Sequence, residues 1–322
     1  VASATANSAT ICTRPFSETL RKIIEPHIRK CTITRERALN AIRRATGASI
    51  YDNILEQFRN GLAVEGEFMF DTELHPILSS FLLSSGLPVS TDLSRLHEHD
   101  GCKDAVFRSI TEEPTSFQLI FDRFVREVCA PHLASVFDCG QIYYQAFPCV
   151  RIVQPDEFSI GPHADVAYGH HPCSVNFYVP LTKIGDTASL FLESEPGKED
   201  WHPIVGEYGD TVKHFAGAIC AHWTSENKTQ QTRVSLDFRL IAGTMFHDLK
   251  CGGLENGGQT DVYRRKEGYY SSCRRITDIN GTSTWEREGQ LLAPDIRTGF
   301  PWTVRNWDQY LEKKRRRKRN LK

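Results

Sequence analysis

Between residues 138 and 240 the chain consists of short runs in which apolar and polar side chains alternate, separated by Pro, Gly or Asp. Because successive side chains of a β-strand point to opposite faces, and because the runs are rich in Val, Ile, Phe, Tyr and Thr, this pattern indicates strands. So many short strands close together predict a sandwich or a barrel. The predicted strands are residues 141–147, 149–154, 174–181, 189–193, 211–215, 218–221 and 232–240.

The residues before this region have apolar side chains at helical spacing. Residues 16–59 predict an amphipathic helical opening, and residues 116–136 predict a second helical segment with a continuous apolar stripe. Residues 60–114 combine turns with a short apolar stretch at 77–83. Helices followed by strands favour an α+β domain in which the helices brace the sheet.

The last part of the chain differs in composition from the predicted strands. Residues 250–299 are Gly-rich and charged, which predicts extended loop that packs on the barrel or covers its mouth. A basic run at 313–319 follows, and we interpret it as a solvated tail rather than a targeting or recruitment signal.

Composition limits the cellular setting. With 39 basic and 40 acidic residues, the formal net charge is -1, so no nucleic-acid partner is expected. The 10 cysteines are scattered singly with no CxxC pair, which favours a reducing, cytoplasmic compartment. No run of apolar residues is long enough to predict a membrane span. A removed N-terminal leader stays an open alternative.

The strongest chemical signal is the segment His163-Ala164-Asp165. Residues i and i+2 of an extended segment point to one face, so the imidazole and the carboxylate can bind one metal ion together. We take His222 as the third ligand, although His202 and His214 compete for this role, because the interval to Arg233 leaves room for a strand and a turn. We interpret His170 and His171 as surface or substrate-facing residues rather than ligands, and we expect nearby thiols to be buried, namely Cys173 and Cys220.

Two imidazoles and one carboxylate occupy one face of an octahedral Fe(II) ion and leave three positions open, enough for a bidentate oxo-acid and O₂. The distal carboxylate of such an oxo-acid suits a planar guanidinium, and Arg233 is the candidate, with a hydroxyl from Ser235 or Thr232. Arg239 shares the strand face of Arg233 and is the rival anchor. Its alternative role is a surface salt bridge, for which Asp237 and Glu193 are the candidate partners.

These residues, with the strings at 175–182, 188–194 and 233–239, resemble the Fe(II)/2-oxoglutarate-dependent dioxygenase superfamily. The resemblance is nearest to the streptomycin-biosynthesis-type oxygenases and more distant to the phytanoyl-CoA hydroxylases, and it covers roughly residues 140–245. It implies a double-stranded β-helix, a cupin-like jelly roll. We therefore expect a single domain, with its parts at about 1–137 (mainly helical support), 138–247 (jelly-roll core) and 248–322 (loops and basic tail).

The resemblance also implies a function. Fe(II) would be held by His163, Asp165 and His222, and 2-oxoglutarate by Arg233 and Ser235, with additional contacts from Asn176 and Tyr178. The reaction would consume O₂, convert 2-oxoglutarate to succinate and oxidise a C–H bond of a small polar or amino-acid-like metabolite by hydroxylation, desaturation or oxidative cyclisation. Ascorbate is expected to help the reaction.

Substrate contacts are predicted from alternation along the strands that lead to the metal. Tyr143, Gln145 and Arg151 alternate in this way, and with Arg239 they form the candidate substrate-binding set. An inward-facing Arg151 would suit a carboxylate or phosphate, whereas the equally weighted alternative places these side chains on the outside of the barrel.

Two further functions stay open at the level of sequence. One keeps the fold and the iron but makes the substrate a protein or nucleic acid, as in a hydroxylase or demethylase, with the basic tail recruiting it. The other is a cupin-like binding or isomerase module that holds zinc or nickel, against which the Arg233-x-Ser235 pair argues. Neither the substrate nor the oligomeric state follows from the sequence.

Overall fold

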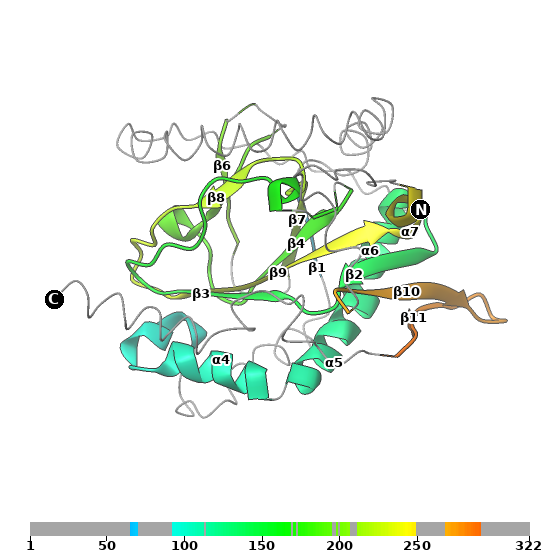
Figure 1. Cartoon of the computed structure of the whole chain (residues 1–322), viewed down its shortest axis with the longest axis horizontal. Helices are drawn as coiled ribbons and strands as arrows, with labels where there is room; N and C mark the ends of the chain where they lie inside the picture. The colour runs from blue at the N-terminus through cyan, green and yellow to red at the C-terminus, as the bar shows by residue number, and fades with distance from the viewer. Residues whose placement is uncertain are drawn as a thin grey trace, which may run out of the picture.

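The computed structural model describes residues 65–69, 92–112, 114–168, 170–171, 173–194, 198, 200–206, 211–248 and 268–290. The predicted helical opening, the apolar stretch at 77–83 and the basic run lie outside these residues. None of the described helices is long and apolar enough to cross a membrane. The elements, in chain order (Figure 1), are β1 (Glu65–Met69), η1 (Leu93–Glu98), α4 (Cys102–Glu112), α5 (Pro114–Phe124), η2 (Val125–Cys129), α6 (Ala130–Phe137), β2 (Gln141–Gln145), β3 (Cys149–Val153), η3 (Asp165–Tyr168), β4 (Val175–Pro180), η4 (Asp186–Ala188), β5 (Leu190–Leu192), β6 (His202–Ile204), β7 (Thr211–Phe215), β8 (His222–Thr224), β9 (Arg233–Ala242), α7 (Gly243–Asp248), β10 (Tyr270–Thr277) and β11 (Ser283–Glu288).

The described strands form two antiparallel sheets. The larger sheet has the order β1-β7-β4-β9-β2-β10-β11, and β3 also pairs with β9. The smaller sheet has the order β6-β5-β8. The β-rich, antiparallel core predicted from the alternation is confirmed. The double-stranded β-helix that the resemblance implies stays a prediction.

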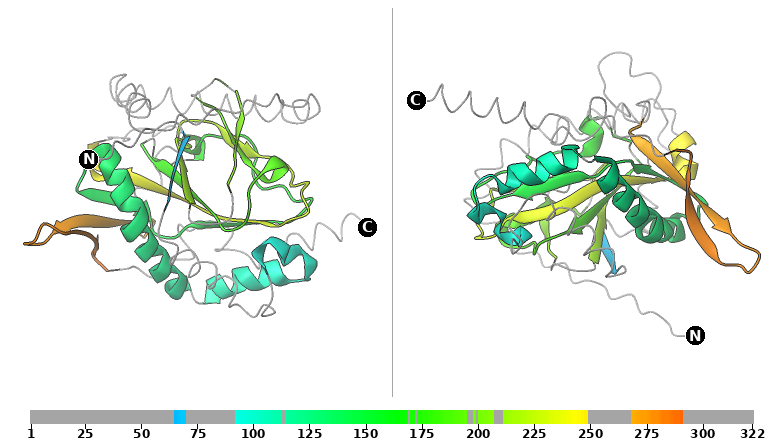
Figure 2. Two further views of the ribbon diagram at one scale, coloured as in Figure 1. Left: turned by 180° about the vertical axis from the view of Figure 1, so that it is seen from behind. Right: turned by 90° about the horizontal axis from the view of Figure 1, so that it is seen from below.

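The long strand β9 shows why the larger sheet is buried on both faces. Its even-numbered side chains are apolar, and Phe238 makes edge-on contacts with helical rings at centroid distances of 4.9 Å to Phe121 and 6.3 Å to Phe124. Phe177 of β4 stacks beside Phe238 at 5.8 Å. The apolar stripe predicted for residues 116–136 therefore covers the outer face of this sheet, where α5, η2 and α6 lie (Figure 2).

The other face of β9 carries polar side chains in a buried position. Across the ladders, Asn176 lies opposite Arg239, Tyr178 opposite Asp237, and Arg151 opposite Ser235. Charged residues are seldom buried unless they have partners or a function. This inward face is therefore where a functional site is expected.

The smaller sheet is joined to the segment that carries His163. A bridge links His163 and His222: each backbone N–H donates to the other residue's carbonyl oxygen, at 3.0 Å from His163 N and at 2.8 Å from His222 N. Asp165 N donates to Gly217 O at 3.0 Å, which anchors the other end of the segment. The backbone thus brings residues far apart in sequence to one place.

Most of the predicted strands are confirmed, and one is wrong. Residues 218–221 form a turn, because Ile219 N and Cys220 N both donate to Ala216 O, and the strand β8 begins only at His222. The alternation did not show this because the segment is buried throughout. The short strand β6 and the helix α4 were not predicted.

The prediction of loop for residues 250–299 is wrong for β10 and β11, which form a hairpin that projects from the larger sheet (Figure 2). Its turn is closed by Asp278, whose carboxylate accepts hydrogen bonds from Asn280 N at 2.9 Å and Thr282 N at 2.8 Å. Gly281 has a φ of 81°, a conformation that glycine adopts without strain. The Asn280-Gly281 pair was a hairpin signal in the sequence.

Candidate metal centre and the adjoining pocket

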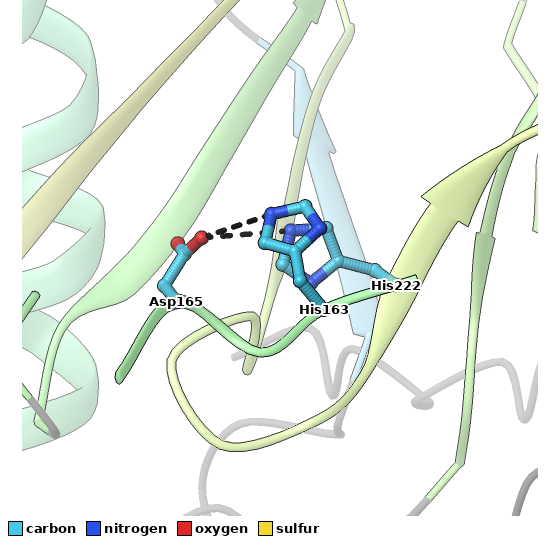
Figure 3. A group of neighbouring side chains, drawn as sticks. All are labelled: His163, Asp165 and His222. Carbon is cyan, nitrogen blue, oxygen red and sulfur yellow. Dashed lines mark ion pairs between the residues drawn. The ribbon is translucent and has the colours of Figure 1, made fainter. Parts of the chain in front are cut away.

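His163, Asp165 and His222 form a buried cluster in which one ligand atom of each lies within 4.8 Å of the others. The Oδ1 atom of Asp165 is 3.4 Å from His163 Nε2 and 3.7 Å from His222 Nε2 (Figure 3). His222 comes from β8, and the other two come from the segment that leads into η3. The structure thus brings together the three residues that the sequence predicted as ligands.

Backbone contacts orient both imidazoles. His163 Nδ1 lies 2.9 Å from Gly161 O, and His222 Nδ1 lies 3.2 Å from Cys220 O. A carbonyl oxygen can only accept, so each Nδ1 carries a proton and each Nε2 is the ring nitrogen that faces the cluster. This is how metal-binding histidines are commonly oriented by their second nitrogen.

The protonation states suit a divalent cation. Burial lowers the pKa of His222 to about 3, with a further contribution from His163, so this imidazole is neutral at neutral pH. Burial alone would raise the pKa of Asp165, but the charge of Arg239 outweighs it and holds that pKa well below its ordinary value. Metal ligands must be deprotonated in this way, and two histidines with one carboxylate fit a facial Fe(II) site.

The second oxygen of Asp165 has its own partners. Asp165 Oδ2 accepts hydrogen bonds from Asn176 Nδ2 and from Arg239 Nε, both at 2.7 Å. Arg239 Nη1 donates to Gln145 Oε1 at 3.1 Å. Asn176 and Arg239, which we predicted as contacts to the oxo-acid and the substrate, therefore hold the carboxylate of Asp165.

Gly217 makes this arrangement possible and was missed from the sequence. A Cβ atom at this position would lie 2.7 Å from Asn176 Cγ and 2.6 Å from the ring of Phe215. Real side chains do not approach so closely, so a glycine is needed where Asn176 reaches Asp165. The sequence offered no signal for this close approach.

A pocket adjoins the cluster on the inward face of the larger sheet. Its wall combines charged and hydroxyl side chains with a few apolar ones, and it opens beside His163 and His222. The lining residues are Arg151, Ser159, Ile160, His163, Asn176, Tyr178, Leu190, Phe215, His222, Thr224, Arg233, Asp237 and Arg239.

Several buried polar atoms on this face have no hydrogen-bond partner among the described residues. The possible donors are Arg233 Nε, Tyr178 OH and Ser235 Oγ, and Asn176 Oδ1 is an acceptor. Arg233 Nη1 donates to Ala188 O at 3.1 Å, which fixes one side of the guanidinium. Buried donors without partners are costly, so a ligand that supplies acceptors fits here. Thr232, the alternative hydroxyl, contacts His97 at 2.9 Å and is turned away from this face.

The candidate substrate contacts occupy different surroundings. Arg151 lines the pocket, and its Nε donates to Asp237 Oδ2 at 2.6 Å. Gln145 is engaged by Arg239 and donates to Phe147 O at 2.7 Å. Tyr143 stacks on Phe246 with ring centroids 3.8 Å apart and is not among the residues of the pocket wall.

The competing histidines lie elsewhere in the described structure. His214 packs against His132 and Phe177, at centroid distances of 5.1 Å and 6.2 Å, on the outer side of β7.

His170 and His171 are 8% and 0% exposed, so the expectation of surface positions was wrong. The expected burial of two neighbouring thiols is confirmed, for Cys173 and Cys220.

No protein-family profile matches this chain. Among curated proteins, the streptomycin biosynthesis protein StrG of Streptomyces griseus is 34% identical over 101 residues, which make up 31% of this chain and 47% of that protein. The match thus spans about half the length of the curated relative.

Similar solved structures have low sequence identity. One is an oxidoreductase of the 2OG-Fe(II) oxygenase family from Burkholderia pseudomallei, with 17% identity, a TM-score of 0.32 and coverage of 39% of this chain and 57% of that one. Another is AviO1 from Streptomyces viridochromogenes Tue57, with 14% identity, a TM-score of 0.36 and coverage of 60% and 96%. The non-heme alpha ketoglutarate dependent epimerase SnoN from nogalamycin biosynthesis has 12% identity, a TM-score of 0.34 and coverage of 60% and 84%. What this chain does must therefore be argued from its own side chains.

Proposed function

We propose that this chain is a non-haem Fe(II)- and 2-oxoglutarate-dependent oxygenase that oxidises a C–H bond of a small polar metabolite. One observation carries the proposal: the buried triad of His163, Asp165 and His222 adjoins a pocket in which Arg233 has no carboxylate partner among the described residues. A metal site with an adjoining anion site is what a chelating oxo-acid requires.

The donor set fits Fe(II), with His163 Nε2, His222 Nε2 and Asp165 Oδ1 as its ligands. Bound there, Fe(II) would supply O₂ activation, with O₂ as the four-electron oxidant: two electrons would come from conversion of 2-oxoglutarate to succinate and CO₂, and two from the C–H bond of the substrate. The chain's own residues have to bind the oxo-acid, orient it and keep water away from the centre.

The inward face carries arginines with different partners, and this difference supports Arg233 as the anchor. Arg151 is paired with Asp237, and Arg239 with Asp165, each through a hydrogen bond from Nε. Arg233 is 3% exposed and donates to a backbone carbonyl instead. In our proposal its guanidinium binds the distal carboxylate of 2-oxoglutarate, because a charge-assisted pair would satisfy the buried cation.

Hydroxyl groups complete the binding of that carboxylate. Tyr178 OH and Ser235 Oγ lie on the same sheet face as Arg233, and both lack partners among the described residues. They would donate to carboxylate oxygens that the guanidinium does not reach. A module that only binds zinc or nickel would have no use for this combination of buried donors, so the oxygenase is favoured over it.

The test is anaerobic titration of the purified protein with Fe(II), followed by 2-oxoglutarate, with the weak visible charge-transfer band of the chelate as the readout. We expect the band to appear only when both are present, and succinate to form when O₂ is admitted with a suitable substrate. Protein that binds Fe(II) but forms neither the band nor succinate would overturn the proposal. Zn(II) in place of Fe(II) is the control and should give no band.

A further inference from the structure

The two oxygens of Asp165 face different surroundings. Oδ1 faces the imidazoles of His163 and His222 at 3.4 and 3.7 Å, whereas Oδ2 is held by Arg239 Nε and Asn176 Nδ2, both at 2.7 Å. We propose that Arg239 and Asn176 are positioning residues that restrict Asp165 to one metal-binding oxygen. This inference rests on the proposed function, because it concerns the same metal.

Restricting Asp165 to one oxygen would affect how many coordination positions of the metal stay open. A carboxylate that is free to rotate can bind a metal through both oxygens, and it then takes up a position that the oxo-acid or O₂ needs. Hydrogen bonds that occupy Oδ2 prevent this. Arg239 and Asn176 thus keep three positions open, which is the feature that separates this type of iron site from a closed one.

The network that holds Arg239 is itself fixed by strand pairing. Asn176 lies directly opposite Arg239 in the antiparallel ladder of β4 and β9, so both side chains reach Asp165 from neighbouring strands. Arg239 Nη1 donates to Gln145 Oε1 at 3.1 Å, and Gln145 donates onward to Phe147 O at 2.7 Å. A guanidinium bound at both Nε and Nη1 has a defined plane, so it presents Nε to Asp165 in one direction.

The charges of Asp165 and Arg239 also support a positioning role for Arg239. Asp165 is 1% exposed, and an isolated carboxylate buried to this extent would be strongly destabilised. Arg239, 5% exposed, supplies the compensating charge at hydrogen-bond distance. The ion pair thus holds the carboxylate through Oδ2 and leaves Oδ1 facing the two imidazoles.

A competing role for Arg239 is the anchor of the oxo-acid. Its Nε and Nη1 already donate to Asp165 and Gln145, so only the remaining Nη hydrogens could reach a distal carboxylate. The two roles predict different defects, one in metal binding and the other in oxo-acid binding.

The experiment compares Arg239→Lys and Asn176→Ala with Arg233→Lys. Anaerobic Fe(II) affinity is measured first without 2-oxoglutarate, and 2-oxoglutarate affinity is then measured at saturating Fe(II) from the chelate band. We expect Arg239→Lys and Asn176→Ala to weaken metal binding about 10- to 100-fold, the usual effect of losing such a partner. Arg233→Lys should leave metal affinity near that of the wild type and weaken 2-oxoglutarate binding.

Co(II) gives a second readout, because its visible spectrum responds to the number of ligands. If Asp165 binds through both oxygens in the variants, the Co(II) spectrum changes shape. A role limited to folding would lower thermal stability and leave the spectrum and the metal affinity unchanged. Asn176→Ala keeps the test decisive if Arg239→Lys does not fold, since it removes one donor without removing a buried charge.

The outcomes separate this inference from the proposed function. Wild-type protein that binds neither Fe(II) nor Co(II) contradicts the proposed function itself. Wild-type protein that forms the chelate, with metal affinities unchanged in the folded Arg239 and Asn176 variants, contradicts only the positioning role. Loss of 2-oxoglutarate binding at unchanged metal affinity in Arg239→Lys would identify Arg239 as the anchor and overturn the inference.

Discussion

Arg233 and Arg239 project from the same face of β9, yet Arg239 donates to the carboxylate of Asp165 at 2.7 Å while Arg233 donates to the carbonyl oxygen of Ala188 at 3.1 Å. Both guanidinium groups are buried, so the difference lies in their partners and not in their access to solvent. One is occupied by the candidate metal centre. The other retains a buried Nε without a partner among the described residues, which makes it the group available to a ligand.

Replacing Arg233 by Ala should raise the 2-oxoglutarate concentration required for half-maximal succinate formation. Loss of charge-assisted hydrogen bonds worth about 1.5–3 kcal/mol corresponds to a factor of roughly 10 to 100. Steady-state kinetics with varied 2-oxoglutarate measure this, and Arg274→Ala on the exposed hairpin is the matched control. An unchanged requirement in Arg233→Ala would place the anchor elsewhere.

Replacing His163 or Asp165 by Ala should abolish the charge-transfer band, because each removes one of the candidate ligands. His214→Gln is the control, since His214 is a buried imidazole on the outer side of β7 that competed with His222 for the third position. It should keep the band. A normal band in Asp165→Ala, or its loss in His214→Gln, would contradict the ligand set.

The residues of the candidate site were predictable where chemistry and sequence spacing coincide. His163 and Asp165 are two positions apart, although only an isolated bridge forms at His163 and Asp165 begins η3. The odd-numbered polar side chains of β9 share a strand face, as the period predicts. Arg233 was chosen as the anchor from the sequence and the proposal keeps it, but the buried ion pair of Arg239 with Asp165 was not predictable. That depends on the register between β4 and β9 and on the path of the segment that carries Asp165, neither of which leaves a pattern in the sequence.

The strand predictions were right where apolar and polar side chains alternate, and they failed where this alternation is absent. The hairpin of β10 and β11 is mostly exposed, so it lacks the apolar alternation that marks a half-buried strand. At the other extreme, residues 218–221 are all buried, and burial on every side hides the difference between a turn and a strand.

Gly217→Ala should weaken metal binding, although Gly217 is not one of the candidate ligands. The added methyl group would lie 2.7 Å from Asn176 Cγ, so Asn176 must move away from Asp165. We expect metal affinity to fall about tenfold and the free energy of unfolding to fall by about 1–3 kcal/mol. Titration calorimetry and urea unfolding measure the two effects. Gly185→Ala is the control, because nothing lies within 4 Å of its added Cβ, and equal behaviour of the two variants would refute the steric argument.

Buried histidines should make the fold sensitive to acid, and His214 offers a way to measure this away from the ligands. Burial lowers the pKa of His214 to about 3, with a smaller contribution from His132, whereas the unfolded chain has the ordinary value. Below about pH 6.5 the unfolded state therefore takes up a proton that the folded state refuses, and stability falls as the pH falls towards 3. The loss from this residue alone is about 2 kcal/mol at pH 5.

The measurement is the urea-unfolding free energy of metal-free protein between pH 7.5 and 5, compared between wild type and His214→Gln. The variant cannot take up this proton in either state, so its stability should decline less steeply with falling pH, whatever its stability at pH 7.5. The exposed His99 supplies the control: the slope of His99→Gln shows what the loss of a surface histidine does, for comparison with the loss of the buried one. Parallel curves for wild type and His214→Gln would show that the imidazole of His214 accepts its proton in the folded state as easily as in the unfolded chain.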